Sequence, residues 1–333
     1  MSSAPVCRAC GLGPVALRGK KPGAFLRREF EFHACAACGF MQVEPFSGFA
    51  IYDDAYYRGA GPDPYVDYAA EYHDWRATDR GLEFADLVRI ADERLRDQKT
   101  KRPKDQDPRI SAGSVSLGPL APRPLVHSAA PLRWLDFGCG AGGFLKFLRA
   151  RGAIAGRPLE LTGHDVGSYA DLLRERDNFR ILGLDALARE PDGSFDLISL
   201  IEVIEHLPEP LEALRLVGRL LKPGGLLLLT TGNLDSPAAL QAGLAYRYCA
   251  PEIHVSLFNP RALTALYRRA GLDPIAVRYD GAVQFKVVKT LRHRPILRVL
   301  ARAALCLPPI VRFIDRRYGV SAMPCAVKPG LKA

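Results

Sequence analysis

The chain has 333 residues, of which 48% are hydrophobic and 25% are charged. This is the composition of a globular protein, and the length suffices for one large α/β domain with accessory segments. No window holds about 18 uncharged apolar residues, so we expect no membrane-spanning helix. The start, MSSAPVCRAC, lacks a basic-then-apolar signal segment. We therefore expect a cytoplasmic protein.

The net charge of +10 is concentrated at the C-terminal end. From Lys286 to Ala333 there are eleven Lys and Arg residues against one acidic residue, Asp315. The rest of the chain is close to neutral. A basic body would suggest nucleic acid as a partner, whereas a basic tail indicates a local anionic contact.

Two C-x-x-C pairs predict a zinc ribbon at residues 1–45. Its ligands would be Cys7, Cys10, Cys35 and Cys38. Each pair ends in glycine, which suits the tight turn that wraps thiolates around an ion, and the alternation in FLRREFEFHA favours a strand between them. Four thiolates leave no open coordination position, so we expect the Zn²⁺ to be structural. The other four cysteines are scattered and are expected to be reduced.

Residues 46–96 are predicted to form an aromatic helical lid, and residues 97–130 a flexible linker. The first segment is rich in tyrosine and acid (IYDDAYYRGAGPDPYVDYAAEYHDW) and continues with helical apolar spacing. The second, RDQKTKRPKDQDPRISAGSVSLGPLAPRP, is rich in Pro, Ser, Gly and charge and has no periodicity.

Short apolar strands alternate with helices between residues 131 and 288. Strands are expected at RWLDFG, LELTGHD, FRILGLD, FDLISL and GGLLLLTTG. Nearly continuous apolar strands separated by helices indicate an α/β fold with a doubly wound, mostly parallel sheet. The closing segments PIAVRYD and AVQFKVVK are joined by a tight Asp280-Gly281 turn. We therefore expect a hairpin whose last strand runs antiparallel to the others.

The stretch LDFGCGAGGF places a glycine turn between the first strand and its helix. Gly138, Gly140 and Gly142 would bring backbone N–H groups and a helix N-terminus close to a ligand. The stretch fits the dinucleotide fingerprint G-x-G-x-x-G and also D-x-G-x-G-x-G, in which Asp136 precedes the glycines. An acid there repels a pyrophosphate but accepts from the ammonium group of an amino-acid cofactor.

Two further acids, Asp165 and Asp185, end the second and third predicted strands. At these places the carboxylate of Asp165 would accept hydrogen bonds from both hydroxyls of a ribose, and Asp185 would lie near an adenine amine. Three acids around a glycine turn suit a cationic ligand better than a diphosphate.

These stretches resemble the class I S-adenosylmethionine-dependent methyltransferases. The resemblance rests on LDFGCGAG, GHD, LDAL, SFDLISLIEVIEHL and LKPGGLLLLTT, in this order, within residues 131–288. It implies a seven-stranded Rossmann-like sheet and S-adenosylmethionine as the cofactor. Asp136, Gly138 and Gly140 would lie under its methionine part, Asp165 at its ribose and Asp185 at its adenine. Catalysis would consist of aligning an acceptor with the sulfonium methyl group and removing a proton.

The order of the segments is similar to that in bacterial methyltransferases of glycans, deoxysugars and secondary metabolites. This looser resemblance implies O-methylation of a sugar, glycan or related small molecule. The alternatives are 2'-O-methylation of RNA, or C- or N-methylation of a nucleotide-linked sugar. Lid tyrosines would stack on sugar faces or simply pack the lid on the domain; they are Tyr52, Tyr56, Tyr57, Tyr65 and Tyr68.

The stretch LIEVIEHLPEP carries Glu202, Glu205 and His206, which are candidate catalytic residues. If residues 202–206 form one helical turn, their side chains share a face. His254, in APEIHVSLFNP, would approach from the same side of the sheet. A similar E-x-x-E-H with a distant His holds Mg²⁺ in the small-RNA 2'-O-methyltransferases, and the ubiquinone-pathway O-methyltransferases carry a similar stretch.

Three roles stay open for this cluster. It would bind a second divalent metal at the acceptor site, where two imidazoles suit Zn²⁺, Mn²⁺ or Fe²⁺ better than Mg²⁺. Alternatively, His254 would act as a general base without a metal. In the third interpretation the side chains only hold the loop.

Residues 289–333 are predicted to form a basic amphipathic tail. In PILRVLARAALCLPPIVRFIDRRYG, Arg298 and Arg302 are four residues apart on an otherwise apolar helix that ends at Pro308-Pro309. This pattern favours an interfacial helix in peripheral contact with the inner face of the membrane, or a helix docked on the core or on a dimer partner. RNA is a less favoured partner because aromatic residues are sparse. The sequence leaves the oligomeric state open.

Overall fold

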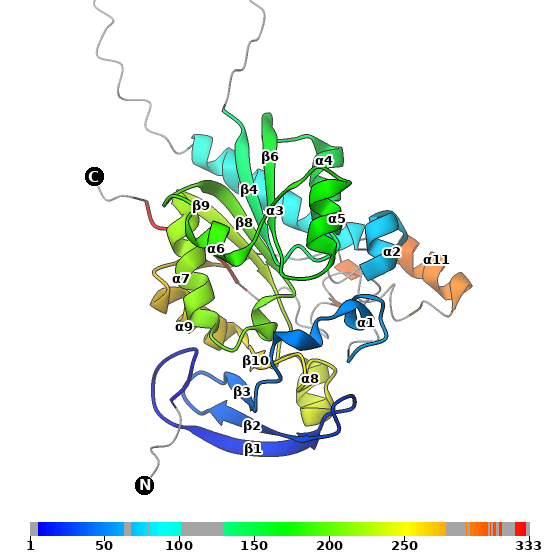
Figure 1. Ribbon diagram of the computed structural model, residues 1–333, viewed down its shortest axis with the longest axis vertical. Helices are drawn as coiled ribbons and strands as arrows, with labels where there is room; N and C mark the ends of the chain where they lie inside the picture. The colour runs from blue at the N-terminus through cyan, green and yellow to red at the C-terminus, as the bar shows by residue number, and fades with distance from the viewer. Residues whose placement is uncertain are drawn as a thin grey trace, which may run out of the picture.

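The fold is described from a computed structural model (Figure 1). Several predictions lie outside the residues that it describes: the linker over residues 101–129, the Asp280-Gly281 turn with the strand after it, and Tyr65. The described residues are 6–62, 68–78, 80–100, 130–277, 291, 294–305, 307, 309–310, 313–314 and 324–330. No helix among them is long and apolar enough to cross a bilayer.

The predicted α/β fold is confirmed. The main sheet has the order β11-β12-β9-β8-β4-β6, with β7 and the short β5 both paired to β6. The pairs between β4, β6, β7, β8 and β9 are parallel, whereas β12 and β11 are antiparallel additions. The bounds are β4 Leu132–Phe137, β5 Ala153–Ile154, β6 Arg157–His164, β7 Arg180–Leu182, β8 Phe195–Ile201, β9 Leu221–Thr230, β11 Asp273–Ile275 and β12 Cys325–Val327.

The antiparallel strand next to β9 comes from the predicted tail, whereas the second strand of the expected hairpin lies outside the described residues. In β12, Ala326 pairs with Leu227 of β9 and also with Pro274 of β11. Cys325 and Ala326 are fully buried. A three-residue apolar segment beside prolines and lysines gives no periodic signal, so the sequence did not predict that residues 325–327 belong to the sheet.

Helices cover both faces of the sheet, and each face has its own core. On one face, Trp134 packs with Phe84 and Phe144; on the other, Leu135 packs with side chains of α7 and α9. The alternation of Trp134 and Leu135 along β4 is what separates these two cores. The helix bounds are α3 Gly81–Thr100, α4 Gly143–Arg151, α5 Tyr169–Glu175, α6 Leu184–Ala188, α7 Pro210–Leu220, α8 Pro237–Ala242 and α9 Pro260–Arg269.

The N-terminal ribbon is a four-stranded antiparallel sheet at one end of the molecule (Figure 1). Three strands are its own: β1 Val15–Pro22, β2 Glu29–Cys35 and β3 Met41–Glu44. The fourth, β10 Ser256–Leu257, comes from the loop before α9 and pairs with β3. Arg269 of α9 also donates to the backbone carbonyls of Arg8 and Ala9. The ribbon is therefore built onto the main domain.

The lid consists of short helices rather than one long one. They are η1 Phe49–Ile51, α1 Asp54–Tyr57, α2 Tyr68–His73 and η2 Trp75–Thr78. The longer α3 follows and continues to Thr100, so the linker cannot begin at residue 97 as predicted. Its apolar residues Phe84, Leu87 and Val88 are buried against the sheet, which accounts for the helix.

Candidate active site

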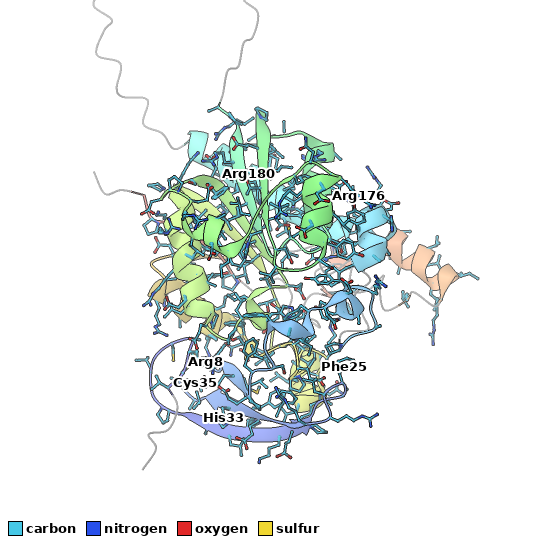
Figure 2. The ribbon with its side chains drawn as sticks, in the orientation of Figure 1. Arg8, Phe25, His33, Cys35, Arg176 and Arg180 are labelled. Atoms are coloured by element: carbon cyan, nitrogen blue, oxygen red, sulfur yellow. The ribbon has the colours of Figure 1, made fainter. Side chains whose placement is uncertain are left out.

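The four predicted zinc ligands come together in the ribbon. Their sulfur atoms all lie within 4.8 Å of one another, and Cys7–Cys38 and Cys10–Cys35 are separated by 3.7 and 3.6 Å. None of the cysteines in the described part of the chain forms a disulfide. The hydrogen bond with Cys38 lowers the pKa of the Cys7 thiol to about 5. The cluster is thus suited to bind a cation through thiolates. Figure 2 shows Cys35 within this ribbon.

The glycine turn joins β4 to α4 as predicted. Gly138, Gly140 and Gly142 have φ values of 75°, 51° and 76°. Residues other than glycine rarely adopt these positive values. A Cβ atom on Gly138 would lie 2.5 Å from Cγ2 of Val203, in the loop after β8. The turn therefore lies directly against the loop that carries the EVIEH stretch.

Asp165 is fixed to this turn by backbone hydrogen bonds. Its Oδ2 accepts from the amide of Gly140 at 2.7 Å, and its Oδ1 accepts from the amide of Gly167 at 2.7 Å. Oδ1 also accepts from the hydroxyl of the lid residue Tyr57 at 3.2 Å. The carboxylate at the end of β6 is therefore part of the glycine turn.

Asp136 is a buried acid at the carboxyl end of β4. Its side chain accepts a hydrogen bond of 2.6 Å from the Ser199 hydroxyl, which itself accepts from the indole N–H of Trp134. Burial raises the pKa of Asp136 to about 7. Within the described residues it has no ion pair, so its charge lacks a direct cationic partner.

Asp185 is placed differently from the prediction. The strand β7 ends at Leu182, and Asp185 lies in the first turn of α6, exposed to solvent. Gly183 precedes the helix as its N-cap residue, and the N-terminus of a helix favours an acidic residue such as Asp185. The apolar letters of FRILGLD resemble a strand, but only its first part forms one.

Residues 202–206 do not form one helical turn. Only Ile204–His206 form a short 3₁₀ helix, and Glu202 precedes it with a left-handed φ of 56°. The Glu202 amide donates to the carbonyl of Thr230, at the end of β9, so the backbone at Glu202 continues the hydrogen bonding between β8 and β9. Its carboxylate instead accepts from the hydroxyl of Tyr248. Glu202 is therefore not part of the group whose ligand atoms converge, although its charge is felt at Glu205.

Glu205, His206 and His254 do converge. Their ligand atoms lie within 4.8 Å of one another, and the two imidazole centroids are 4.8 Å apart. Nδ1 of His254 donates to the carbonyl of Tyr248 at 2.9 Å, and Nδ1 of His206 donates to the carbonyl of Ile253 at 3.0 Å. Because a carbonyl can only accept, the bond to Tyr248 makes Nε2 the unprotonated nitrogen of the neutral His254 ring.

The electrostatics of this cluster favour neutral groups. Burial, and next the charge of Glu202, raise the pKa of Glu205 well above its usual range. Burial, and next the neighbouring His206, lower the pKa of His254 well below its usual value. Oε2 of Glu205 accepts from the Thr231 hydroxyl at 2.9 Å, whereas Oε1 is buried with no hydrogen-bond partner among the described residues. A buried carboxylate oxygen without a hydrogen-bond partner is stabilised by a proton or by a bound cation.

Comparison with known proteins agrees with the fold. A family model described as "Methyltransferase domain" matches residues 88–277, which is more than half of the chain. The chain belongs to this methyltransferase family. The predicted S-adenosylmethionine-dependent methyltransferase is thereby confirmed.

Curated relatives of this methyltransferase include ubiquinone biosynthesis O-methyltransferases. That of Xanthomonas campestris pv. campestris is 33% identical over 238 residues, covering 67% of this chain and 86% of the relative. That of Ralstonia nicotianae is 30% identical over 166 residues, covering 46% and 69%. A solved Haloferax volcanii complex of the Trm112 methyltransferase activator and a methyltransferase matches with a TM-score of 0.41 and 14% identity, covering 79% and 98%.

Three charged residues of α2, α3 and the segment between them form an enclosed group that the sequence analysis did not single out. Glu71 is buried, and a Cβ atom on Gly143 would collide with its carboxylate. Arg80 pairs with Glu71 at 2.9 Å and with Glu83 at 3.6 Å. In the sequence these charges resemble a solvated helix surface, and only the tertiary packing reveals that they are enclosed.

The lid tyrosines divide into two groups. Tyr56 and Tyr57 are buried and pack around Ile253, so they hold the lid on the domain and cannot offer a face to a sugar. Tyr52 is half-buried, and its hydroxyl lies 2.9 Å from Nδ1 of His206. Tyr68 lies against the glycine turn, 3.0 Å from the position of a Cβ on Gly140. At least two of the five lid tyrosines, Tyr56 and Tyr57, therefore serve to pack the lid on the domain.

Proposed function

We propose that this methyltransferase methylates a hydroxyl oxygen of a sugar, glycan or related small molecule. The observation that carries the proposal is the buried His254, whose unprotonated Nε2 lies in a cluster next to the glycine turn. Such a group is suited to accept a hydroxyl proton near neutral pH. The name of the curated relatives, O-methyltransferase, supports oxygen as the acceptor atom.

The residues around the glycine turn fit S-adenosylmethionine. Asp136 is a buried acid without a direct cationic partner in the described chain, which suits an ammonium group, and Asp165 offers a carboxylate for ribose hydroxyls. Gly138, Gly140 and Gly142 would let the backbone approach the ligand closely. When bound, this cofactor supplies an electrophilic methyl group, whose carbon–sulfur bond breaks as the carbon–oxygen bond forms.

The chain's own residues would orient the acceptor and take its proton. Nε2 of His254 would receive the hydroxyl proton, while the Tyr248 carbonyl holds the opposite ring nitrogen. Glu205 and His206 would hold the hydroxyl in place. Tyr52, in edge contact with His206 at a centroid distance of 5.5 Å, supports an acceptor with a ring face such as a sugar.

Zinc in the ribbon is part of this proposal. A tetrahedral Zn²⁺ with Zn–S bonds of about 2.3 Å requires sulfur separations of about 3.8 Å. The distances of 3.6 and 3.7 Å agree with this geometry. Cys7, Cys10, Cys35 and Cys38 would hold the ion, which stabilises the fold and leaves no position for a substrate.

A second metal at the acceptor cluster is the main competitor of the base mechanism. Two imidazoles and one carboxylate form a donor set that suits Zn²⁺ or Fe²⁺, and Glu205 has an oxygen to offer. Such an ion would lower the pKa of an acceptor hydroxyl. The measurement that separates the two is the metal content of the wild type, His206→Ala and Cys10→Ser proteins. In the base mechanism the wild type contains one ion per chain, under saturating Mn²⁺, and His206→Ala does not change that number.

The reaction itself is tested with labelled S-adenosylmethionine. The purified protein is incubated with sugars, nucleotide-linked sugars, phenols and RNA, and the labelled products are identified by mass spectrometry. We expect an O-methyl ether on a sugar or small molecule, and at least a hundredfold loss of turnover in His254→Ala with unchanged binding of S-adenosylhomocysteine. Labelling of RNA only, or of nitrogen or carbon, would overturn the proposal.

A further inference from the structure

The helix α11, Pro295–Ala304, exposes an apolar surface near the C-terminal end of the chain. Ile296, Val299 and Leu300 are 76%, 67% and 60% exposed, and Leu297 is 44% exposed. The large exposed apolar side chains in the described residues number fifteen, and six of them lie between Ile296 and Phe313. Figure 1 shows α11 at the edge of the molecule, away from the main sheet. The body of the protein thus leaves this surface uncovered.

The order of residues in α11 gives the helix two different sides. At about 100° per residue, Ile296, Leu297, Val299 and Leu300 fall within an arc of about 160°. Positions 298 and 302, both arginine, lie on the opposite side of the helix axis. An isolated arc of large apolar residues with basic residues behind it is the pattern of a helix that lies in a lipid–water interface.

The charge of the surrounding segment indicates an anionic partner. Residues 286–333 contain eleven basic residues and one acidic residue. Without them, the 46 basic and 36 acidic residues of the whole chain leave 35 of each sign. The entire net charge of +10 therefore belongs to the segment that contains α11. Exposed apolar side chains and this charge together match an anionic bilayer surface, which offers both components.

A second copy of the chain would be a poorer partner for the same surface. Association through α11 would bring two segments of net charge +10 together, and like charges oppose that contact. Among the described residues next to the helix, Leu305, which follows it, is buried, and Arg294, which precedes it, is exposed. This arrangement presents the apolar arc outward.

We propose that α11 docks this methyltransferase on anionic membrane surfaces, with its apolar arc in the acyl–headgroup boundary. The inference does not depend on the identity of the methyl acceptor. The test is flotation of the full chain with vesicles of phosphatidylcholine, with and without phosphatidylglycerol. We expect binding to the anionic vesicles that is at least tenfold stronger than to the neutral ones, and that weakens as NaCl is raised from about 0.05 to about 0.5 M.

The decisive variant is Ile296→Glu/Leu300→Glu, which places two charges within the apolar arc. We expect it to lose binding to anionic vesicles at least tenfold, while Leu240→Glu binds like the wild type. Leu240 is 69% exposed on α8 and is the matched control for an apolar-to-acid change on a surface helix. Unchanged titration with S-adenosylhomocysteine shows that both variants are folded.

Three results would overturn the proposal. One is equal binding of neutral and anionic vesicles, and another is equal loss of binding in the α11 and Leu240 variants. The third is a wild-type dimer in light scattering that the α11 variant converts to a monomer, without vesicle binding by either, since α11 would then be a dimer contact.

Discussion

The backbone amide of Val43, in the ribbon, donates a hydrogen bond of 3.0 Å to the carbonyl of Val255. Val255 follows the candidate base His254 directly, and its own amide donates to the carbonyl of Glu205 at 2.8 Å. At the other end of the same loop, the Glu252 carboxylate accepts from the amide of Phe25, at 2.7 Å, in the turn between β1 and β2 (Figure 2). The ribbon therefore holds the loop that carries His254.

This relationship predicts that loss of the ribbon's metal affects the acceptor site rather than the cofactor site. We expect Cys35→Ser to lower kcat/KM for the acceptor at least tenfold, because β3 would no longer fix Val255. The Kd of S-adenosylhomocysteine should change less than about threefold, since Asp136 lies on β4 and the glycine turn joins β4 to α4. Hydrogen exchange gives an independent measure: the amide of Val255 should exchange faster in the variant.

The control for this experiment is His33→Ala, on the same strand β2 but outside the cysteine cluster. It should leave the exchange rate at Val255 and the acceptor kinetics unchanged. Equal protection of Val255 in Cys35→Ser and wild type would show that the ribbon and the acceptor loop are independent.

A second prediction concerns the pH dependence of cofactor binding. The pKa of Asp136 is about 7 in the free protein because the group is buried, and an ammonium partner would stabilise its charged form. Below pH 7 the carboxyl must release a proton on binding, so affinity for S-adenosylhomocysteine should fall by up to about tenfold per pH unit. Above pH 7 the affinity should be constant.

Calorimetric titration in two buffers with different ionisation enthalpies measures this proton release directly. We expect close to one proton released at pH 6 and almost none at pH 8. Asp136→Asn should bind more weakly and release no proton at either pH. Proton release that persists in Asp136→Asn would assign it to another group.

A third prediction is that Glu205→Gln stabilises the protein at high pH while it lowers activity. The folded-state pKa of Glu205 is raised, so its favourable contribution is complete below the ordinary glutamate value of 4.5 and is lost as pH rises toward the folded pKa. Glutamine keeps the size and can still accept from Thr231 but never becomes charged. The free energy of unfolding of the variant should exceed that of the wild type by about 1 kcal/mol or more at pH 8.5.

Melting temperatures at pH 5, 7 and 8.5, measured without cofactor, test this sign. The difference between variant and wild type should be near zero at pH 5 and should grow to roughly 2–4 °C or more at pH 8.5. Asp192→Asn, which changes an exposed carboxylate on the surface, is the comparison for a general charge effect. A lower melting temperature for Glu205→Gln at pH 8.5 would show that the carboxylate is ionised and paired in the folded state.

The sequence predicts the parts of this protein that depend on local pattern. The strand β4, the glycine turn and α4 follow from apolar runs and from glycines that local geometry requires. The four cysteines follow from spacing, since two short thiol pairs have few other uses. Glu205, His206 and His254 could also be predicted as neighbours, because each lies in a connection that follows a parallel strand, and these strands end at the same edge of the sheet.

Features that depend on distant contacts could not be predicted in this way. The three residues of β12 become a strand only because β9 and β11 leave a gap that they fill. Arg80 and Glu71 look like solvated charges until the lid encloses them. The spacing of Glu202 predicts that it shares a helix face with Glu205 and His206. Its backbone is not helical, however, because its amide bonds to Thr230 and its φ is left-handed, and its carboxylate is not in the ligand group.

The last prediction tests His254 as the proton acceptor. Burial and the adjacent His206 lower the pKa of His254, so it stays neutral and able to accept a proton well below pH 6.5. The measurement uses saturating cofactor, so that the titration of Asp136 does not affect the profile. Under this condition kcat/KM for the acceptor should rise with pH and reach its plateau below pH 6.5. His206→Ala removes one cause of the lowered pKa, so the inflection should move upward in pH even if turnover falls. A purely structural His254 would give no such inflection, and an upward limb centred above pH 7 would assign the titration to the acceptor hydroxyl or to Glu205.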